Sequence, residues 1–276
     1  MSEETIREVA AAIEKAEALI ITAGAGMGVD SGLPDFRGRE GFWRAYPKLK
    51  AMRLDFESIA TPAWFDEDAE LAWGFYGHRL ELYRRTVPHE GFSILRELAR
   101  HKACGAFVVT SNVDGQFQKA GFDPERVLEV HGTIHQNQCS ARCEPVLFDT
   151  PAAMEIDECE LRARPPLPAC PRCGAVARPN ILMFNDFDWV ERRTEAQRAR
   201  FHRWLHDVGT GSTVIVELGA GRAVSTIRHI SERLAHSANA TLVRINPRDV
   251  DVPEGHFALA QGALPALRAI AQRLSG

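Results

Sequence analysis

Residues 20–38 read Ile-Ile-Thr-Ala-Gly-Ala-Gly-Met-Gly-Val-Asp-Ser-Gly-Leu-Pro-Asp-Phe-Arg-Gly. A β-rich run from Ala18 to Thr22 leads into the glycines at positions 24, 26 and 28. Glycines at a strand end let the backbone turn sharply and bring its N–H groups against a pyrophosphate at the start of a helix. Gly-x-Gly also occurs in ordinary tight turns, so the glycines alone are a weak indication. The stretch predicts a phosphate-binding loop that needs support from the rest of the chain.

Apolar, β-branched runs recur along the chain, and segments with helical spacing separate them. The expected strands are residues 18–22, 106–110, 127–130, 213–218 and 241–245, and the expected helices include residues 3–16, 92–100 and 225–235. This alternation predicts an α/β fold with a doubly wound, mainly parallel, Rossmann-like sheet. Ligands of such sheets bind at the C-terminal ends of the strands, where the glycine stretch lies.

Two segments interrupt the alternation. Residues 39–88 are rich in aromatic side chains and predict a loop followed by a helical module over the cleft. Residues 135–177 contain paired cysteines and several prolines and show little periodicity. This pattern predicts a smaller module stabilised by a bound metal ion. We therefore expect one Rossmann-like domain built from residues 1–38, 89–134 and 178–276, into which these two modules are inserted.

Composition limits the class of protein. The chain has 276 residues, 45% of them hydrophobic, which is enough for a large core with a small satellite domain. A net charge of -4 gives no footprint for nucleic acid, and no apolar run approaches the ~20 residues that span a bilayer. The acidic N-terminus lacks the features of a secretory signal, so we expect a cytoplasmic protein.

The six cysteines indicate a metal site rather than disulfides. Two close pairs stand in the second interrupting segment, namely Cys139 with Cys143 and Cys170 with Cys173. Four thiolates satisfy the tetrahedral preference of Zn²⁺ and leave no open position, so the predicted site is structural. Cys104, just before an expected strand, is interpreted as a core residue.

Three ordered blocks resemble the sirtuin family. Residues 24–37 resemble the sirtuin signature Gly-Ala-Gly-Ile-Ser, two variable residues, then Gly-Ile-Pro-Asp-Phe-Arg. Residues 110–115, Thr-Ser-Asn-Val-Asp-Gly, resemble Thr-Gln-Asn-Ile-Asp-Gly, and residues 129–132, Glu-Val-His-Gly, resemble Glu-Leu-His-Gly. The resemblance continues through the cysteine pairs and the run 178–184 to Asn246, and so covers nearly the whole chain.

The resemblance implies an enzyme that transfers an acyl group from a modified protein lysine to the ADP-ribose of NAD and releases nicotinamide. His131 matches the family's base, and imidazole titrates near neutral pH. Asn112 and Asp114 match residues that hydrogen-bond the carboxamide of nicotinamide. One structural zinc ion and an acylated protein partner are implied as well, with no role for nucleic acid or membrane.

Further contacts with NAD are implied by the matched motifs. Asp35 would order the loop, Phe36 would shield the reacting anomeric carbon, and Arg37 would face phosphate or ribose. The full implied set is Gly24, Ala25, Gly26, Met27, Asp35, Phe36, Arg37, Ser111, Asn112, Asp114, His131, Gly219, Ala220, Gly221 and Asn246.

Several positions depart from the family pattern, mostly where the acylated peptide would bind. Met183, Phe184 and Asn185 match the substrate-binding segment, but Asn185-Asp186 stands where Gly-Glu is usual. The other departures are Gly28 for serine, Ser111 for glutamine, Gln116-Phe117 for Leu-His, Thr226 for the proline after Val224, and residues 219–222, Gly-Ala-Gly-Arg, for Gly-Thr-Ser-Leu. The first cysteine pair also has three intervening residues in place of two, so Cys159 is kept as a reserve zinc ligand.

One pair of residues bears on the choice of acyl group. Tyr76 and Arg79 lie three residues apart, on one face of an expected helix, and resemble the Tyr-x-x-Arg pair of sirtuins that remove succinyl and malonyl groups. A guanidinium with a phenol can hold a terminal carboxylate. Tyrosine and arginine are also ordinary residues on an amphipathic helix, which is the alternative interpretation.

Two other functions stay open from the sequence. An ADP-ribosyltransferase or NAD glycohydrolase on the same scaffold would keep Asn112, Asp114 and the glycine loop but relax the peptide groove. A non-catalytic sensor of NAD or ADP-ribose would have no need of a base, so the presence of His131 argues against it.

Overall fold

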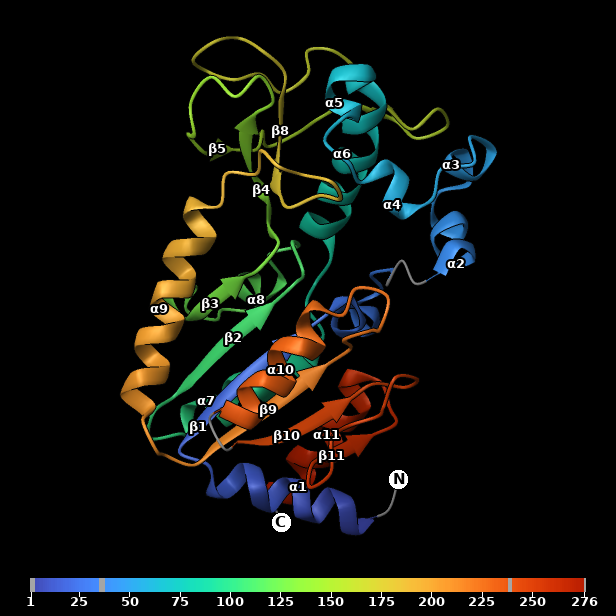
Figure 1. Cartoon of the computed structure of the whole chain (residues 1–276). Helices are drawn as coiled ribbons and strands as arrows, with labels where there is room; N and C mark the ends of the chain where they lie inside the picture. The colour runs from blue at the N-terminus through green and yellow to red at the C-terminus, as the bar shows by residue number, and fades with distance from the viewer. Residues whose placement is uncertain (1–2, 35–37, 238–239, 276) are drawn as a thin grey trace.

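Six parallel strands form the main sheet of the protein, for which the computed structural model describes residues 3–34, 38–237 and 240–275 (Figure 1). In sheet order the strands are β3 (Val127–Glu129), β2 (Ala106–Thr110), β1 (Ala18–Ala23), β9 (Thr213–Leu218), β10 (Thr241–Ile245) and β11 (Phe257–Leu259). The chain winds outward from β1 to β3, returns beside β1 with β9, and winds outward again to β11. This order confirms the expected doubly wound, Rossmann-like fold, and β1 and β9 flank the point where the winding reverses.

All five strands expected from the sequence are present, and only β3 ends one residue earlier than expected, at Glu129. The sixth strand, β11, was missed because its three residues lie at an edge, where a short segment has little periodicity. Helix α9 (Arg192–Val208) was missed as well, because its long charged face hides the few apolar positions.

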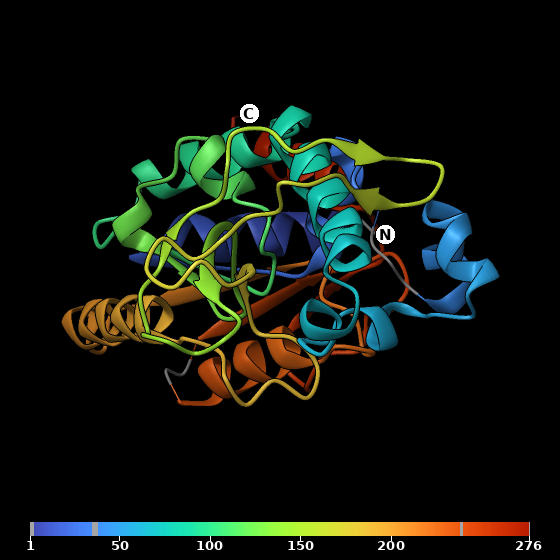
Figure 2. The same cartoon turned by 90° about the horizontal axis from the view of Figure 1, so that it is seen from above.

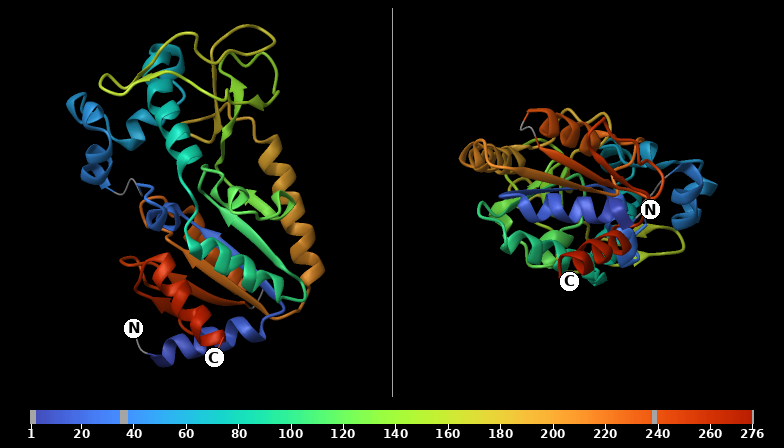
Figure 3. Two further views of the ribbon diagram at one scale, coloured as in Figure 1. Left: turned by 180° about the vertical axis from the view of Figure 1, so that it is seen from behind. Right: turned by 90° about the horizontal axis from the view of Figure 1, so that it is seen from below.

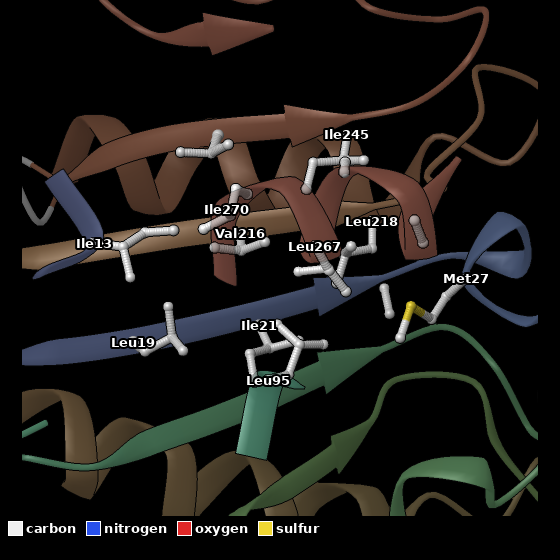
Figure 4. Close-up of a cluster of buried hydrophobic side chains, with 14 of the residues drawn as sticks. Ile13, Leu19, Ile21, Met27, Leu95, Val216, Leu218, Ile245, Leu267 and Ile270 are labelled. Atoms are coloured by element: carbon white, nitrogen blue, oxygen red, sulfur yellow. The ribbon is translucent and has the colours of Figure 1, made fainter. Parts of the chain in front are cut away.

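Helices cover both faces of the sheet (Figure 3). One face carries α1 (Glu3–Lys15), α7 (Glu90–Arg100) and α11 (Ala263–Leu274), and the other carries α9 and α10 (Thr226–Ser237). Leu19 and Ile21 of β1 pack on the first face (Figure 4), whereas Ala18 and Ile20 pack on the second. Successive strand residues point to opposite faces, and helices cover both faces. Neither face of β1 therefore meets solvent, which explains its apolar sequence.

A second part of the molecule lies beyond the C-terminal ends of these strands, in the upper half of Figure 1. Its helices are α2 (Gly38–Ala45), α3 (Pro47–Ala51), α4 (Phe56–Ile59), α5 (Trp64–Glu67) and α6 (Ala69–Arg85). An antiparallel sheet joins β5 (Phe148–Asp149), β4 (Gly132–Cys139) and β8 (Ala177–Ile181), and a hairpin joins β6 (Ile156–Asp157) and β7 (Arg162–Ala163). The expected limits of the two modules stay predictions, since β4 and β8 cross residues 135 and 177.

Helix α6 is the central helix of this second part, and a separate hydrophobic cluster surrounds it. Figure 2 shows the hairpin of β6 and β7 beside the helix. A Cβ at Gly74 would lie 1.9 Å from the carbonyl oxygen of Leu161, so only glycine lets the helix rest directly on the hairpin backbone. The close packing fixes the inner face of α6, which presents side chains to the cleft between the two parts.

A buried ion-pair network braces the C-terminal ends of β9 and β10. Arg244, which is fully buried, donates to both carboxylate oxygens of Glu217 at 2.5 and 3.0 Å and to Glu232 at 2.8 Å. It also donates to the backbone carbonyl of Asp251. Since the same guanidinium holds two strands, α10 and the loop after β10, it fixes the outline of the cleft on that side.

No helix of the described residues is long and apolar enough to cross a bilayer.

Candidate active site

Two glycine-containing loops meet where the winding of the sheet reverses. Gly24 follows β1 and Gly219 follows β9, and Gly26 N donates to the carbonyl of Gly219 at 3.0 Å. A Cβ at Gly26 would lie 2.6 Å from the Cα of Gly219, and Gly219 itself has a φ of +61°. The two loops therefore pack backbone against backbone, which no residue with a side chain allows.

The segment after Gly24 differs in one respect from the expectation of an α-helix. It forms a 3₁₀ helix, η1 (Ala25–Ser31), that contains Gly26 and Gly28. Glycines weaken regular α-helix, and the close approach to Gly219 leaves room only for a short, tight turn. The N–H groups at its start still lie beside the cleft.

A cavity of 1010 Å³ opens beside these loops. Most of the residues singled out from the sequence line it: Gly24, Ala25, Tyr76, Arg79, Ser111, Asn112, Asp114, His131, Met183, Phe184, Gly219, Ala220 and Gly221. These residues come from both parts of the molecule, so the cavity lies between the sheet and α6. Its volume is at the upper end of the range for small-molecule sites and suits a dinucleotide together with part of a second ligand.

Four expected site residues are not part of the lining described for the cavity. Met27 is fully buried in the core under η1 (Figure 4), and Gly26 packs on Gly219. Asn246 is fully buried, and its amide donates to the carbonyl of Ala220 at 2.8 Å, so it supports the loop that lines the cavity. The fourth, Asn185, is exposed and lies in the turn after β8. Asp35, Phe36 and Arg37 lie outside the described residues.

Asn112 lies at the junction of β1 and β2. Its backbone N–H donates to the hydroxyl oxygen of Thr110 at 3.0 Å, and its side-chain Nδ2 donates to the carbonyl of Gly24 at 3.0 Å. Ser111 N donates to the carbonyl of Ala23 at 3.1 Å. These bonds fix the Asn112 amide against the glycine loop, where its position is set by both strands.

Asp114 is buried in the wall of the cavity, and its Oδ1 accepts a hydrogen bond from Gln116 N at 2.9 Å. Burial raises the pKa of the Asp114 carboxyl to about 6, and the charge of Glu129 adds to the effect. His135 Nε2 lies 3.0 Å from the backbone carbonyl oxygen of Asp114, and this contact stabilises the turn that carries the carboxyl. The carboxyl therefore titrates close to neutral pH, as functional groups often do.

This raised pKa predicts that Asp114→Asn stabilises the fold at neutral pH. A carboxyl whose pKa rises from 3.8 to about 6 on folding leaves the free energy of unfolding unchanged below pH 4. Above pH 6 it lowers that free energy by the full amount of the shift. A shift of about 2 units corresponds to about 3 kcal/mol of unfolding free energy at pH 8, and about half of it near pH 5. Urea unfolding at both pH values measures this, and a variant no more stable than the wild type at pH 8 would contradict it.

His131 follows β3 and is half-buried beside Asn112 and Asp114 in the cavity lining. Its backbone carbonyl accepts from Leu182 N at 3.0 Å, which ties it to the segment after β8. Burial lowers the pKa of the imidazole below its ordinary value. The ring is therefore neutral at pH 7 and able to accept a proton.

Tyr76 and Arg79 lie on the inner face of α6 and both line the cavity. Tyr76 is 1% exposed and Arg79 is 7% exposed. The guanidinium carbon of Arg79 lies 5.3 Å from the ring centre of Phe75 and 5.7 Å from those of Phe56 and Tyr76. Burial raises the pKa of the Tyr76 phenol, so its O–H stays available as a donor. The pair thus forms a buried, cationic pocket wall rather than an exposed helix face.

The segment after β8 is held by a second buried ion pair. Arg178 donates to both oxygens of Asp186, at 2.7 and 2.8 Å, and neither side chain is more than 2% exposed. Asn185 has a φ of +55°, a conformation that glycine adopts readily and asparagine better than most residues. The departure from Gly-Glu to Asn-Asp therefore keeps a tight turn and a buried acid at the edge of the cavity.

Sequence reasoning missed several cavity residues, above all Tyr83, Phe56 and Arg248. Tyr83 could have been found, because it stands four residues after Arg79 on the same helix and so shares its face. Phe56 begins the short helix α4 and Arg248 lies in the loop after β10, and the approach of both to the cavity depends on tertiary packing.

The four expected zinc ligands converge in the second part of the molecule. Cys139, Cys143, Cys170 and Cys173 place their sulfurs within 4.8 Å of one another. The sulfurs of Cys139 and Cys173 are 3.6 Å apart, as are those of Cys143 and Cys170. Tetrahedral zinc with thiolates at about 2.3 Å separates sulfurs by about 3.8 Å, so the set fits Zn²⁺. Backbone N–H groups of Cys173 and Arg172 lower the pKa of Cys170 to about 7, which favours the thiolate.

The remaining cysteines are not part of this cluster. Cys159, kept as a reserve ligand, is exposed and lies outside it, so the three-residue spacing of the first pair does not prevent convergence. Cys104 packs against the core, as expected.

Comparison with known proteins agrees with these features. A model of the Sir2 family matches residues 24–216. An NAD-dependent protein deacylase of Aeropyrum pernix is 30% identical over 246 residues, which is 88% of this chain and 86% of the relative. One of Thermus thermophilus is 30% identical over 268 residues, which is 96% of this chain and 93% of the relative.

Solved structures agree in fold. A Sir2 homologue in complex with NAD matches with a TM-score of 0.71 and 22% identity, covering 97% of this chain and 93% of that chain. A mutant Sir2 homologue in complex with ADP-ribose matches with a TM-score of 0.71 and 23% identity, covering 97% of this chain and 96% of that chain.

Proposed function

Since the chain belongs to the Sir2 family, we propose that it removes acyl groups from protein lysines in an NAD-dependent reaction. The acyl group passes to the ADP-ribose part of NAD, one water molecule is consumed, and nicotinamide and the free lysine leave. The observation that carries the proposal is the single cavity that joins His131, Asn112 and Asp114 to the paired glycine loops of β1 and β9.

The cavity residues fit NAD in two regions. The loops at Gly24 and Gly219 present backbone groups where a doubly wound sheet binds a dinucleotide. Asn112 and Asp114 lie farther in, where an amide and a carboxyl can hydrogen-bond the carboxamide of nicotinamide. When bound, NAD supplies the ribosyl centre that receives the acyl oxygen.

His131 acts as the base that takes a proton from a ribose hydroxyl. Its lowered pKa keeps the imidazole neutral at pH 7, and the ring lies in the same cavity as Asn112. Activity is therefore expected to fall only at pH values below the ordinary range of histidine, as the imidazole becomes charged.

The acylated lysine enters between two segments that border the cavity. Met183 and Phe184 line it on one side, and Ala223 and Val224 line it on the other. The ion pair of Arg178 and Asp186 holds the first segment in place. The four-cysteine site binds one structural zinc ion and keeps the strands β4 and β8, which carry this segment, in register.

We further propose that the enzyme prefers acidic acyl groups such as succinyl and malonyl. The guanidinium of Arg79 and the phenol of Tyr76 lie in the wall of the cavity, and Arg79 keeps its charge when buried. A terminal carboxylate complements this buried charge, and a charge-assisted hydrogen bond is stronger than one between neutral groups. The cytoplasmic location expected from the sequence stays a prediction.

Acyl preference is tested by Arg79→Met, with kcat/KM measured on succinyl-lysine and acetyl-lysine versions of one peptide. Loss of a charged hydrogen bond should lower kcat/KM for the succinyl peptide about 10- to 100-fold, with little change for the acetyl peptide. Arg85→Met is the matched control, because Arg85 lies on the same helix but is exposed. Equal losses on both peptides would contradict the preference.

A further inference from the structure

Tyr83 has a specific contact with the guanidinium of Arg79. Its phenolic oxygen accepts hydrogen bonds from Arg79 Nε at 3.1 Å and from Nη2 at 2.8 Å. Both side chains line the cavity, and Tyr83 is 5% exposed. Two bonds to one oxygen define the plane and the rotation of the guanidinium, so this contact does more than fill space.

The contact also decides which edge of Arg79 meets a ligand. A guanidinium can bind a carboxylate through its Nε edge or end on through its two terminal nitrogens. Because Tyr83 accepts from Nε and Nη2 along the first of these edges, a ligand carboxylate would meet the guanidinium end on. Arginine otherwise has considerable rotamer freedom, and fixing it beforehand reduces the entropy lost when a ligand binds.

Tyr83 is itself held by a residue beside the nicotinamide end of the site. Gln116 Nε2 donates to the backbone carbonyl of Tyr83 at 2.9 Å, and Gln116 N donates to Asp114 Oδ1 at 2.9 Å. Gln116 is 2% exposed. Glutamine at position 116 departs from the usual leucine, and a leucine could not make the bond to Tyr83. Arg79, Tyr83, Gln116 and Asp114 therefore form one chain of contacts along the cavity wall.

We propose that Tyr83 is a positioning residue for acyl recognition: its phenolic oxygen orients Arg79 so that the guanidinium meets the carboxylate of an acidic acyl group end on. The inference rests on the proposed preference for acidic acyl groups and adds the residue that makes Arg79 effective. Tyr83 acts through Arg79 and does not itself need to touch the substrate.

Tyr83→Phe tests this, because it keeps the ring that packs 5.5 Å from the guanidinium carbon and removes only the oxygen. The succinyl-to-acetyl ratio of kcat/KM should fall at least about fivefold, as expected for loss of hydrogen bonds to a charged group. The loss should appear as a higher KM and a higher Kd for the succinyl peptide, with kcat little changed. Tyr46→Phe is the matched control, because the Tyr46 hydroxyl lies in the same aromatic cluster but contacts His78 Nδ1 at 3.2 Å.

A double variant, Arg79→Met with Tyr83→Phe, separates the possible outcomes. With Arg79 absent, removing the Tyr83 oxygen should have no further effect on the ratio. A ratio that is unchanged in Tyr83→Phe but falls in Arg79→Met overturns the positioning role and leaves the acyl preference intact. A wild type with no preference, unaffected by Arg79→Met, overturns the preference and the positioning role together. Equal losses of kcat on both peptides, or the same change in Tyr46→Phe, also contradict positioning.

Discussion

His131→Ala lowers kcat for lysine deacylation about 10²- to 10⁴-fold, the usual contribution of a general base. The imidazole is neutral because burial lowers its pKa, and it lies in the cavity with Asn112 and Asp114. Alanine removes the proton acceptor but leaves the glycine loops unchanged. Calorimetric titration with NAD should therefore give a Kd close to that of the wild type, and rapid-mixing assays should show the loss in the chemical step.

The control for this variant is His101→Ala, which removes an exposed imidazole just after α7, at a residue with no proposed role. It should keep wild-type kcat. If His131→Ala deacylates at the wild-type rate, the base lies elsewhere. If it loses NAD binding in parallel with kcat, His131 serves the cofactor rather than proton transfer.

Removal of zinc has the second large effect. The four-cysteine site braces β4 and β8, and a structural zinc ion stabilises the folded state directly. Cys170→Ser should abolish stoichiometric zinc and lower Tm by roughly 10 °C, since the loss of a few kcal/mol shifts Tm by that amount in a chain of this size. Deacylation should fall as well, because β8 leads into the segment with Met183.

Cys159→Ser is the matched control for the zinc site. Cys159 is exposed and lies outside the cluster, so this variant should hold one zinc per chain and melt like the wild type. Metal analysis of both folded proteins decides the assignment. Full zinc occupancy in Cys170→Ser, or loss of zinc in Cys159→Ser, would contradict it.

The sequence predicted the sheet well because its strands are buried on both faces. Runs such as residues 18–22 and 213–218 are mostly apolar and β-branched, with Glu217 as the one charged residue, and glycines follow both runs where the winding of the sheet reverses. The edge strand β11 has three residues, and α9 has a strongly charged face, so local pattern alone could not reveal them. Their place depends on neighbours distant in the sequence.

Much of the candidate site could also be predicted, because motif residues follow strand ends and strand ends meet at one edge of the sheet. Asn112, Asp114 and His131 come together for that reason. The supporting contacts could not be predicted. The partners in the pairs Arg178–Asp186 and Arg244–Glu217 come from different segments, and only the folded chain makes their charges meet. The sequence places Tyr83 on the same helix face as Arg79, but it does not show the hydrogen bonds between the two side chains.

Mass spectrometry of the products formed from NAD and a succinyl-lysine peptide is the decisive test of NAD-dependent deacylation. We expect nicotinamide, free-lysine peptide and O-acyl-ADP-ribose in equal amounts, with no product when NAD is omitted. Nicotinamide accompanied by free or protein-linked ADP-ribose, with both the succinyl and the acetyl peptide left intact, would contradict deacylation. That result would assign the cavity to NAD hydrolysis or ADP-ribosyl transfer.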